Sequence, residues 1–277
     1  MTLENKKNDV LWLVEDLGDI FFSFVKKKKR IYEIGYYDCI LGRDSYKSLA
    51  QIDGKCIYHG SLGILNFLKN INLNPGPIAS LDKFRCSFYY PRLGDKLLNS
   101  DHIILTMDEF LTQKEMIFDS FSKDGYVFIR PDSGFKIFTG TKINEEDISQ
   151  GNVSRFSFDT DLILVTSPKN IFREWRLVVS EEQIVAGCQY INSSGEIDFD
   201  TNIPKSVTNY IQHEIKGSWS PDLIYVMDVV ECEGDDIKIL ELNSFSCSDF
   251  YECNPAVIVD FVENLIGNLI GNGNDAI

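Results

Sequence analysis

The segment LIYVMDVVECEGDDIKILELNSF places acidic side chains inside apolar strands, and it constrains the fold more than any other part of the chain. It predicts two strands, over 223–231 and 237–243, joined by an acidic turn. Side chains alternate between the faces of a strand, so Glu241 and Asn243 share a face, and Asp228 can lie across from them. A charge in a buried strand is costly unless it is paired or bound to a metal.

These three side chains form an oxygen-rich set. Asp228, Glu241 and Asn243 supply two carboxylates and one amide oxygen, the ligand types that a hard cation such as Mg²⁺ prefers. Mg²⁺ held by few protein oxygens takes its other ligands from water and substrate phosphates. The hairpin therefore predicts a magnesium site in an enzyme that uses a nucleotide. Acidic residues beside a hairpin can also be solvated surface charges, and this alternative stays open.

A basic strand end and the loop after it can hold phosphate. Arg130 closes the predicted strand GYVFIRP, and the following loop DSGFKIFTG carries Ser133, Gly134 and Lys136. The backbone amides and the lysine of such a loop can surround phosphate oxygens. The loop matches neither GxxxxGK[ST] nor GxGxxG, so a surface hairpin with incidental charge is the alternative.

A second basic cluster lies in the predicted strand EWRLVVS. Glu174 and Arg176 are two residues apart and share a face, and Tyr190 on the next predicted strand can line the same pocket. Arginine suits bidentate binding of phosphate or carboxylate. An exposed ion pair or a structural bridge is the alternative. The three histidines show no zinc-ligand spacing, and we expect no catalytic histidine.

Composition excludes several classes of protein. The net charge of −15 over 277 residues argues against a general duplex-DNA binder or an anionic-membrane binder. No apolar run reaches membrane-spanning length, and the charged start of the chain lacks the apolar core of a signal peptide. We therefore expect a cytoplasmic protein with no general nucleic-acid or membrane binding. The seven cysteines form no CxxC pair and are interpreted as reduced packing thiols.

Strands and helices alternate along the chain, which predicts an α/β (α+β) fold with domains over 1–103 and 104–277. The basic run 26–30 is interpreted as a solvated helix end or turn, with a partner contact as the alternative. The first domain is expected to contain a strand over 9–15, a helix or extended segment over 17–29, a strand over 31–41, a strand–turn–helix unit over 56–70 and a loop over 74–80. From there on we expect strands over 102–105, 125–131, 161–167, 174–180 and 183–190, and helices over 107–122, 203–215 and 255–270.

Taken in order, FIRPDSGFKIFTG, LILVTSP, EWRLVV, VMDVV and ILELN resemble the ATP-grasp superfamily over roughly residues 102–263. That superfamily carries a strand with a basic residue and a proline before a glycine-rich loop. A hinge strand, an arginine strand, an acidic residue and an E-x-N motif follow. The chain is similar to a clade named for two arginines and one lysine, which is found in phage and bacterial genomes. The resemblance implies an ATP-grasp domain over 104–277 after a small preATP-grasp-like α/β domain over 1–103.

The resemblance also implies a role for each motif residue. Mg²⁺ that bridges the ATP phosphates would be bound by Asp228, Glu241 and Asn243. Arg130 would stand where a phosphate-binding lysine is common, and Lys136 would contact phosphate with the loop residues Ser133 and Gly134.

The remaining implied roles concern the nucleoside and the transferred group. Thr166 and Ser167 would form the adenine hinge, mostly through backbone groups, although this hinge lacks the acidic residue that often follows its strand. Glu174 would hold the ribose or orient Arg176. Arg176 would hold the transferred phosphate or the acyl substrate, so that Arg176 and Lys136 are the expected catalytic residues.

The implied reaction is an ATP- and Mg²⁺-dependent ligation. A carboxylate is phosphorylated to an acylphosphate, and an amine then attacks it to form an amide. The partners would be a small-molecule or peptide carboxylate and an amine. Two alternatives stay open: an ATP-dependent phosphotransferase on the same fold, and a non-catalytic nucleotide-binding interaction protein. The sequence identifies neither substrate and leaves the oligomeric state open.

Overall fold

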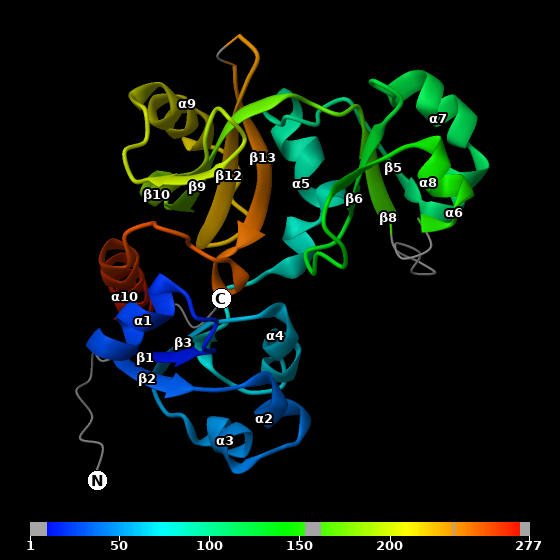
Figure 1. The fold of residues 1–277 in the computed structure, drawn as a ribbon. Helices are drawn as coiled ribbons and strands as arrows, with labels where there is room; N and C mark the ends of the chain where they lie inside the picture. The colour runs from blue at the N-terminus through cyan, green and yellow to red at the C-terminus, as the bar shows by residue number, and fades with distance from the viewer. Residues whose placement is uncertain (1–9, 153–161, 235, 272–277) are drawn as a thin grey trace.

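Three sheets organise the part of the chain that the computed structural model describes, residues 10–152, 162–234 and 236–271. Figure 1 shows one sheet low in the molecule and the other two above it. The lower, parallel sheet consists, in spatial order, of β2 (Arg30–Glu33), β1 (Leu11–Val14), β3 (Lys55–His59) and β4 (Asn74–Gly76). The helices that accompany it are α1 (Ile20–Lys28), α2 (Tyr36–Ile40), α3 (Asp44–Lys47) and α4 (Leu62–Leu68).

The two upper sheets are antiparallel. The five-stranded sheet consists of β11 (Ile197–Asp200), β10 (Gln183–Ile191), β9 (Ile171–Ser180), β12 (Ile224–Cys232) and β13 (Ile237–Ser244). The outer sheet consists of β5 (His102–Thr106), β8 (Leu162–Thr166), β6 (Val127–Pro131) and β7 (Thr141–Ile143). Their helices are α5 (Cys86–Leu93), α6 (Met107–Thr112), α7 (Lys114–Phe121), α8 (Glu145–Ser149), α9 (Lys205–Ile215) and α10 (Pro255–Gly271). Short 3₁₀ turns are η1 (Ser48–Gln51), η2 (Leu81–Phe84), η3 (Gly94–Lys96) and η5 (Phe245–Cys247).

The central strands of the parallel sheet, β1 and β3, are largely apolar and buried because helices cover both faces of the sheet. Trp12 and Ile57 pack with α1 and α10 on one face. Leu13 and Tyr58 pack with α4 on the other face. The C-terminal helix therefore lies beside the first helix of the chain, as Figure 1 shows at the left.

The sequence predicts this half of the chain well in two places and wrongly in two others. Of the helix or extended segment expected over 17–29, the helix is the one that forms, and the strand–turn–helix unit over 56–70 is confirmed. The expected strand over 31–41 is wrong beyond β2, because the chain turns at Gly35 into α2. The expected loop over 74–80 includes β4, which pairs with β3. The first residue of the predicted strand 9–15 lies outside the described residues.

The five-stranded sheet buries one face against α5 and α9. Trp175, Leu177 and Met227 alternate onto this face, where the buried side chains of both helices meet them. Because α5 precedes residue 103, a helix from the expected first domain packs on a sheet of the expected second one. The boundary between 103 and 104 stays a prediction.

The helix expected over 107–122 begins where the capping pattern predicts but is divided into two. Thr106 Oγ1 accepts a hydrogen bond from Glu109 N at 3.2 Å, and Glu109 Oε2 accepts one from Thr106 N at 2.8 Å. The helix α6 ends at Thr112, and α7 begins at Lys114 after the single residue Gln113. The other strands and helices predicted after residue 123 are all present, with bounds that differ by up to three residues; residue 161, the expected start of β8, lies outside the described residues.

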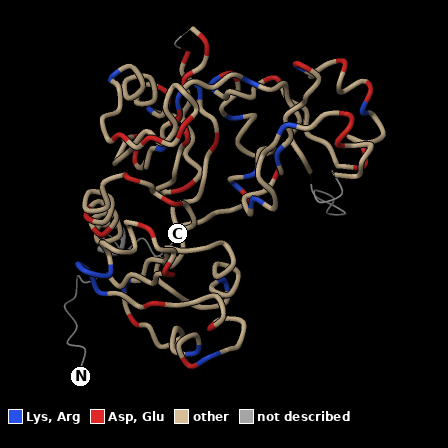
Figure 2. The backbone as a smooth tube through the Cα atoms, in the orientation of Figure 1, with Lys and Arg blue, Asp and Glu red and all other residues tan. Residues whose placement is uncertain are grey.

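The basic run 26–30 is a helix end that meets acidic residues of the same chain. Lys26, Lys27 and Lys28 form the last turn of α1, and Lys29 Nζ lies 2.9 Å from Glu263 Oε2 on α10. Figure 2 shows this run as a blue segment in a chain where red acidic segments are spread over all three sheets. Among the described residues, no helix is long and apolar enough to span a bilayer.

His59 ends β3 inside the aromatic core between the parallel and five-stranded sheets. Its ring stacks on Phe250 with centroids 4.8 Å apart, lies 4.6 Å from Phe21, and is 1% exposed. Burial lowers the pKa of His59 to about 3. Because the unfolded chain binds a proton near the ordinary histidine pKa and the folded one does not, this group makes unfolding easier as pH falls.

We expect acidification from about pH 7.5 to about pH 5 to remove about 2 kcal/mol of stability through His59 alone. In the His59→Leu variant, the free energy of unfolding should fall by about 2 kcal/mol less than in the wild type between these pH values, as measured by urea unfolding at both. The exposed His213→Leu variant is the matched control and should keep the wild-type dependence. An unchanged dependence in His59→Leu would contradict the assignment.

Candidate functional site

Three charged side chains form a row across adjacent strands of the five-stranded sheet. Arg176 on β9 pairs with Asp228 on β12, and Asp228 pairs with Glu241 on β13. Paired residues project to the same side of a sheet, so the row lies on the face opposite α5 and α9. Glu174 and Asn243 lie two residues along their strands from this row and share its face. Asp228 therefore lies directly across from Glu241, in keeping with the expectation that it can face Glu241 and Asn243.

Arg176 and Asp228 form a buried two-bond ion pair. Arg176 Nε and Nη2 each donate to one Asp228 carboxylate oxygen at 2.8 Å, and the two residues are 7% and 1% exposed. Arg176 Nη1 donates to the Asp249 carbonyl at 2.7 Å, and its guanidinium lies 4.4 Å from the centre of the Tyr251 ring. The alternatives to ligand binding by Arg176 are an exposed ion pair and a structural bridge. The pair of Arg176 with Asp228 is buried, so it is a structural bridge.

Burial dominates the protonation of Asp228. Loss of solvent raises the pKa of Asp228, and the neighbouring Arg176 opposes that shift. Burial disfavours the charged form of Arg176, but Asp228 outweighs it and raises the Arg176 pKa above its ordinary value. Arg176 is therefore always charged, and its charge stabilises the ionised form of the buried Asp228.

Glu241 is held between two cations from the outer sheet and its loop. Arg130 Nη2 donates to Glu241 Oε2 at 2.8 Å, and Lys136 Nζ donates to Oε1 at 2.8 Å. Burial alone would raise the pKa of Glu241, but Lys136 and Arg130 hold it well below its usual range. The carboxylate is ionised at neutral pH.

Asn243 has one amide atom without a protein partner. Its Nδ2 donates to Asp228 Oδ2 at 3.2 Å and to Glu241 Oε1 at 2.9 Å. Its Oδ1 is buried and makes no hydrogen bond to any residue that the structure describes, although a buried amide oxygen normally has a partner. A buried amide oxygen that lacks a hydrogen-bond partner and lies beside two carboxylates is suited to bind a cation.

The donor set fits Mg²⁺ only if the amide oxygen takes part. Among the described residues, no group of three or more His, Cys, Asp or Glu side chains gathers in a way that could hold a metal. Asp228, Glu241 and the free Oδ1 of Asn243 supply oxygen ligands alone, which suits a hard cation that takes its other ligands from water and phosphates.

The loop after β6 carries Lys136 to Glu241 through a compact turn. Phe135 N donates to Ser133 Oγ at 3.1 Å, Lys136 N donates to the Ser133 carbonyl at 3.2 Å, and Lys136 has a φ of 47°. A side chain at Gly134 would place its Cβ closer to the Leu81 carbonyl oxygen than a van der Waals contact allows. Glycine is therefore required at this position by a close approach of two backbones.

The Gly134→Ala variant should be destabilised by about 1–3 kcal/mol, because backbone atoms must move to admit the methyl group. The same displacement should weaken the contact between Lys136 and Glu241. Urea unfolding measures the loss. Gly267→Ala is the matched control, since a Cβ at that position in α10 meets nothing within 4 Å. Equal stability of the two variants would contradict the close-approach argument.

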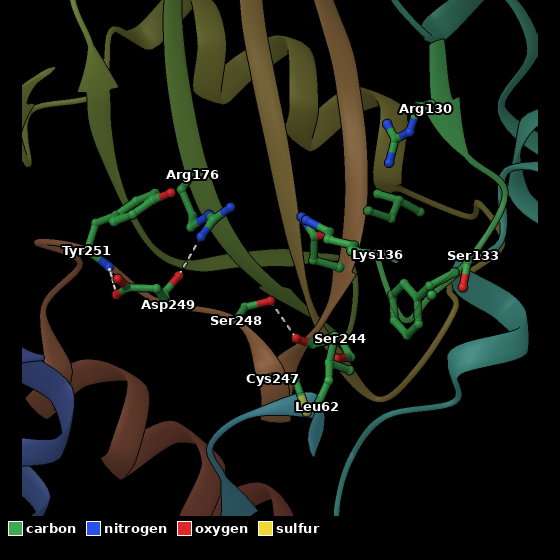
Figure 3. A pocket seen from close by; sticks show the side chains of 14 residues that line it. Leu62, Arg130, Ser133, Lys136, Arg176, Ser244, Cys247, Ser248, Asp249 and Tyr251 are labelled. Atoms are coloured by element: carbon green, nitrogen blue, oxygen red, sulfur yellow. Dashed lines mark hydrogen bonds between the residues drawn. The ribbon is translucent and has the colours of Figure 1, made fainter. Parts of the chain in front are cut away.

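Two cavities meet along this row of charges. The inner one, of about 200 Å³, is polar, and Figure 3 shows Arg176 and Tyr251 on one side of it and Arg130 and Lys136 on the other. The second cavity, of about 480 Å³, lies between the outer and five-stranded sheets. It is lined by Phe128, Arg130, Pro131, Lys136, Phe138, Thr139, Gly140, Ile171, Glu174, Leu240 and Glu241.

Most residues expected at the site come together, but the expected hinge residues lie apart. Ser133, Gly134, Lys136, Arg130, Arg176 and Asn243 line the inner cavity. Glu174 lines the second cavity and accepts a hydrogen bond from the Tyr190 hydroxyl at 2.5 Å. Thr166 is fully buried and donates to the Asp101 carbonyl at 2.9 Å, and neither Thr166 nor Ser167 lines either cavity.

Sequence reasoning missed several residues of the inner cavity, and two of them contact Arg176. Asp249 and Tyr251 contact Arg176 from the turn after η5, where no strand or helix pattern guides a prediction. A weak signal exists in the segment SDFYE, which combines aromatic and acidic residues directly after the hairpin. The aromatic residues of the second cavity were also missed, since they resemble ordinary core.

Comparison with known proteins points to one family. A family model for an ATP-grasp domain, family 2 of the clade named for two arginines and one lysine, matches residues 112–261, more than half of the chain. A search of curated proteins found no match.

Solved structures share the fold at low sequence identity. The D-alanine–D-alanine ligase from Coxiella burnetii has a TM-score of 0.63 at 10% identity, over 96% of this chain and 97% of that chain. The Bacillus anthracis D-alanine–D-alanine ligase complexed with ATP has a TM-score of 0.55 at 11% identity, over 85% and 86%. The ATP-grasp ligase PsnB complexed with minimal precursor has a TM-score of 0.54 at 11% identity, over 92% and 99%.

Proposed function

The chain belongs to the two-arginine, one-lysine clade of the ATP-grasp domain family, and from this premise we propose that it is an ATP- and Mg²⁺-dependent ligase that joins a carboxylate to an amine. The observation that carries the proposal is the position of Glu241 between Arg130 and Lys136, with the free Asn243 Oδ1 close by. Arg130 and Lys136 supply positive charge that suits phosphate oxygens. The Glu241 carboxylate and the Asn243 amide supply oxygens that suit the metal ion of a metal-bound nucleotide.

Each part of the site would have a distinct task. Asp228, Glu241 and Asn243 would hold Mg²⁺, and the chemistry that a bound Mg²⁺ supplies is neutralisation of phosphate charge during transfer. Arg130 and Lys136 would turn from Glu241 to the phosphate oxygens.

Arg176 would bind the carboxylate substrate or the phosphoryl group that is transferred to it. Its three hydrogen bonds engage three of the five N–H groups of a guanidinium, so it can still donate to a phosphate or carboxylate. Because the ion pair with Asp228 fixes the plane of the guanidinium, little ordering is needed when a substrate binds.

The second cavity is the proposed nucleoside site. Phe128, Phe138, Ile171 and Leu240 offer apolar contacts for a base, and Arg130 and Lys136 stand at the boundary with the inner cavity. Glu174 would take the ribose. Thr166 and Ser167 do not line this cavity, but Thr166 pairs with Phe128 of β6, which does, and we keep both as proposed hinge residues through their backbone groups.

The proposed reaction passes through an acylphosphate. A carboxylate oxygen attacks the terminal phosphorus of ATP and releases ADP, and an amine then displaces phosphate to form the amide. ATP-grasp ligases of similar fold are described as acting on D-alanine and as complexed with a precursor peptide, so we propose both small molecules and peptides as substrate classes. The proposed compartment is the cytoplasm.

The test has two stages. Calorimetric titration of ATP with and without Mg²⁺ should show binding that depends on the metal. Mixtures of amino acids and peptides are then screened for release of ADP together with inorganic phosphate, which a ligase produces in equal amounts. ADP release with a stable phosphorylated product would favour a phosphotransferase. Absence of ATP binding would refute the nucleotide site itself.

A further inference from the structure

Two cysteines that play no part in the proposed reaction lie in contact behind Arg176. Cys188 on β10 and Cys253 in the turn before α10 have their sulfur atoms 3.5 Å apart, and they are 0% and 1% exposed. All seven cysteines of the chain are free thiols in the structure. A disulfide needs a sulfur–sulfur distance of about 2 Å, so a shift of roughly 1.5 Å would bring this pair to bonding distance.

The pair is connected to the site through the backbone. Cys188 lies opposite Arg176 in the β9–β10 register, and Cys253 Sγ donates to the Arg176 carbonyl at 3.7 Å. The turn that ends at Cys253 also supplies Asp249 and Tyr251, which contact the Arg176 guanidinium. A bond between the two sulfurs would therefore join this turn to the sheet that carries Arg176.

Cys188 differs from the other six cysteines in the direction of its pKa shift. A hydrogen bond from Cys253 lowers the pKa of Cys188, although burial opposes the shift. The same contact and burial raise the pKa of Cys253. Burial also raises the pKa of the remaining five, to about 11 for Cys39 and to about 12 for Cys56 and Cys247. Cys188 is therefore the cysteine best able to form a thiolate, the reactive species.

We propose that Cys188 and Cys253 are a modification site, a dithiol that hydrogen peroxide oxidises to a disulfide across β10 and the turn 248–253. The Cys188 thiolate attacks peroxide and becomes a sulfenic acid as hydroxide leaves, and the hydroxide takes up the proton that the Cys188 thiol had released to become water. The Cys253 sulfur then displaces water from the sulfenic sulfur to close the bond. Two thiols and one peroxide give one disulfide and two waters, so two electrons pass to the peroxide.

The path for peroxide runs through the turn. Glu252 and Asn254, on either side of Cys253, are exposed, so a small movement of this turn uncovers the sulfur pair. The disulfide removes the hydrogen that Cys253 donates to the Arg176 carbonyl and holds the turn to β10. The proposal does not depend on the ligase function.

The experiment treats the full chain with hydrogen peroxide and measures intact mass and a peptide map of the remaining thiols. We expect loss of two hydrogen atoms, a cross-linked peptide that contains Cys188 and Cys253, and full reversal by dithiothreitol. Methionine sulfoxides do not reverse in this way. The melting temperature should rise by roughly 5 °C or more on oxidation, because the bond closes a long loop of the unfolded chain.

Three variants make the result decisive. Cys188→Ser and Cys253→Ser should each lose the cross-link, and Cys247→Ser, altered in the neighbouring 3₁₀ turn, should keep it. The peptide map of the wild-type protein decides the matter alone if a variant folds poorly. Persistence of both thiols while other cysteines are oxidised, or a disulfide to any other cysteine, would overturn the proposal.

Discussion

Replacing Arg176 with leucine is expected to lower the free energy of unfolding by about 3–5 kcal/mol, because it leaves the Asp228 carboxylate buried without a partner. Asp228 is 1% exposed, and both of its oxygens accept hydrogen bonds from the arginine. After the change, Asn243 Nδ2 is the only donor to this carboxylate among the described residues. Urea unfolding followed by tryptophan fluorescence measures the loss.

The loss should depend on pH in a defined direction. Burial already raises the pKa of Asp228, and Arg176 opposes that shift, so the variant raises the pKa further. A group with a raised folded pKa binds more protons in the folded state than in the unfolded state, so stability rises as pH falls through it. The deficit of Arg176→Leu relative to wild type should therefore be greatest at neutral to alkaline pH and should shrink on acidification.

Two further variants test the cause of the loss. Arg173→Leu, on the same strand, breaks a half-exposed pair with Glu231 and should cost less than about 1 kcal/mol. The double variant Arg176→Leu with Asp228→Leu removes both charges and should be more stable than Arg176→Leu alone. If Arg173→Leu and Arg176→Leu lose equal stability, the buried pair does not have the energetic role that its burial implies.

The grouping of the three proposed metal ligands could be predicted from the sequence because it depends on local rules. Asp228, Glu241 and Asn243 lie on two strands joined by a short turn, so alternation and hairpin pairing are enough to bring them together. Arg176 was expected near this group only through a family resemblance. Its contact with Asp228 depends on β9 lying beside β12, a pairing across 52 residues that no local pattern determines.

The missed elements share a physical cause. The segment after β2 is apolar and aromatic, as a strand would be, yet Asp38 Oδ2 accepts a hydrogen bond from Gly35 N at 3.1 Å and a helix begins there. Asp249 and Tyr251 occupy a turn whose shape is set by tertiary contacts with Arg176. A local hydrogen bond in the first place and tertiary contacts in the second outweigh the propensity that a sequence pattern measures.

Changing Glu241 to glutamine should weaken Mg-ATP binding by at least about 100-fold, because it removes a charged oxygen from the proposed metal site. Glutamine has nearly the same shape, so the hydrogen bond from Asn243 Nδ2 can be kept. The change also frees Arg130 and Lys136, which both bind this carboxylate in the structure. ATP without Mg²⁺ should therefore bind the variant at least as well as it binds the wild type.

This opposite response separates two roles for Glu241. If Glu241 is a metal ligand, the gain in ATP affinity that Mg²⁺ provides should fall from large in the wild type to near zero in the variant. If Glu241 only positions Arg130 and Lys136, ATP binding should weaken equally with and without the metal. Calorimetric titration of ATP at both conditions measures the ratio, and Glu231→Gln, at the far end of β12, should leave it unchanged. Equal weakening in both conditions would remove Glu241 from the metal site and leave it as the anchor of Arg130 and Lys136.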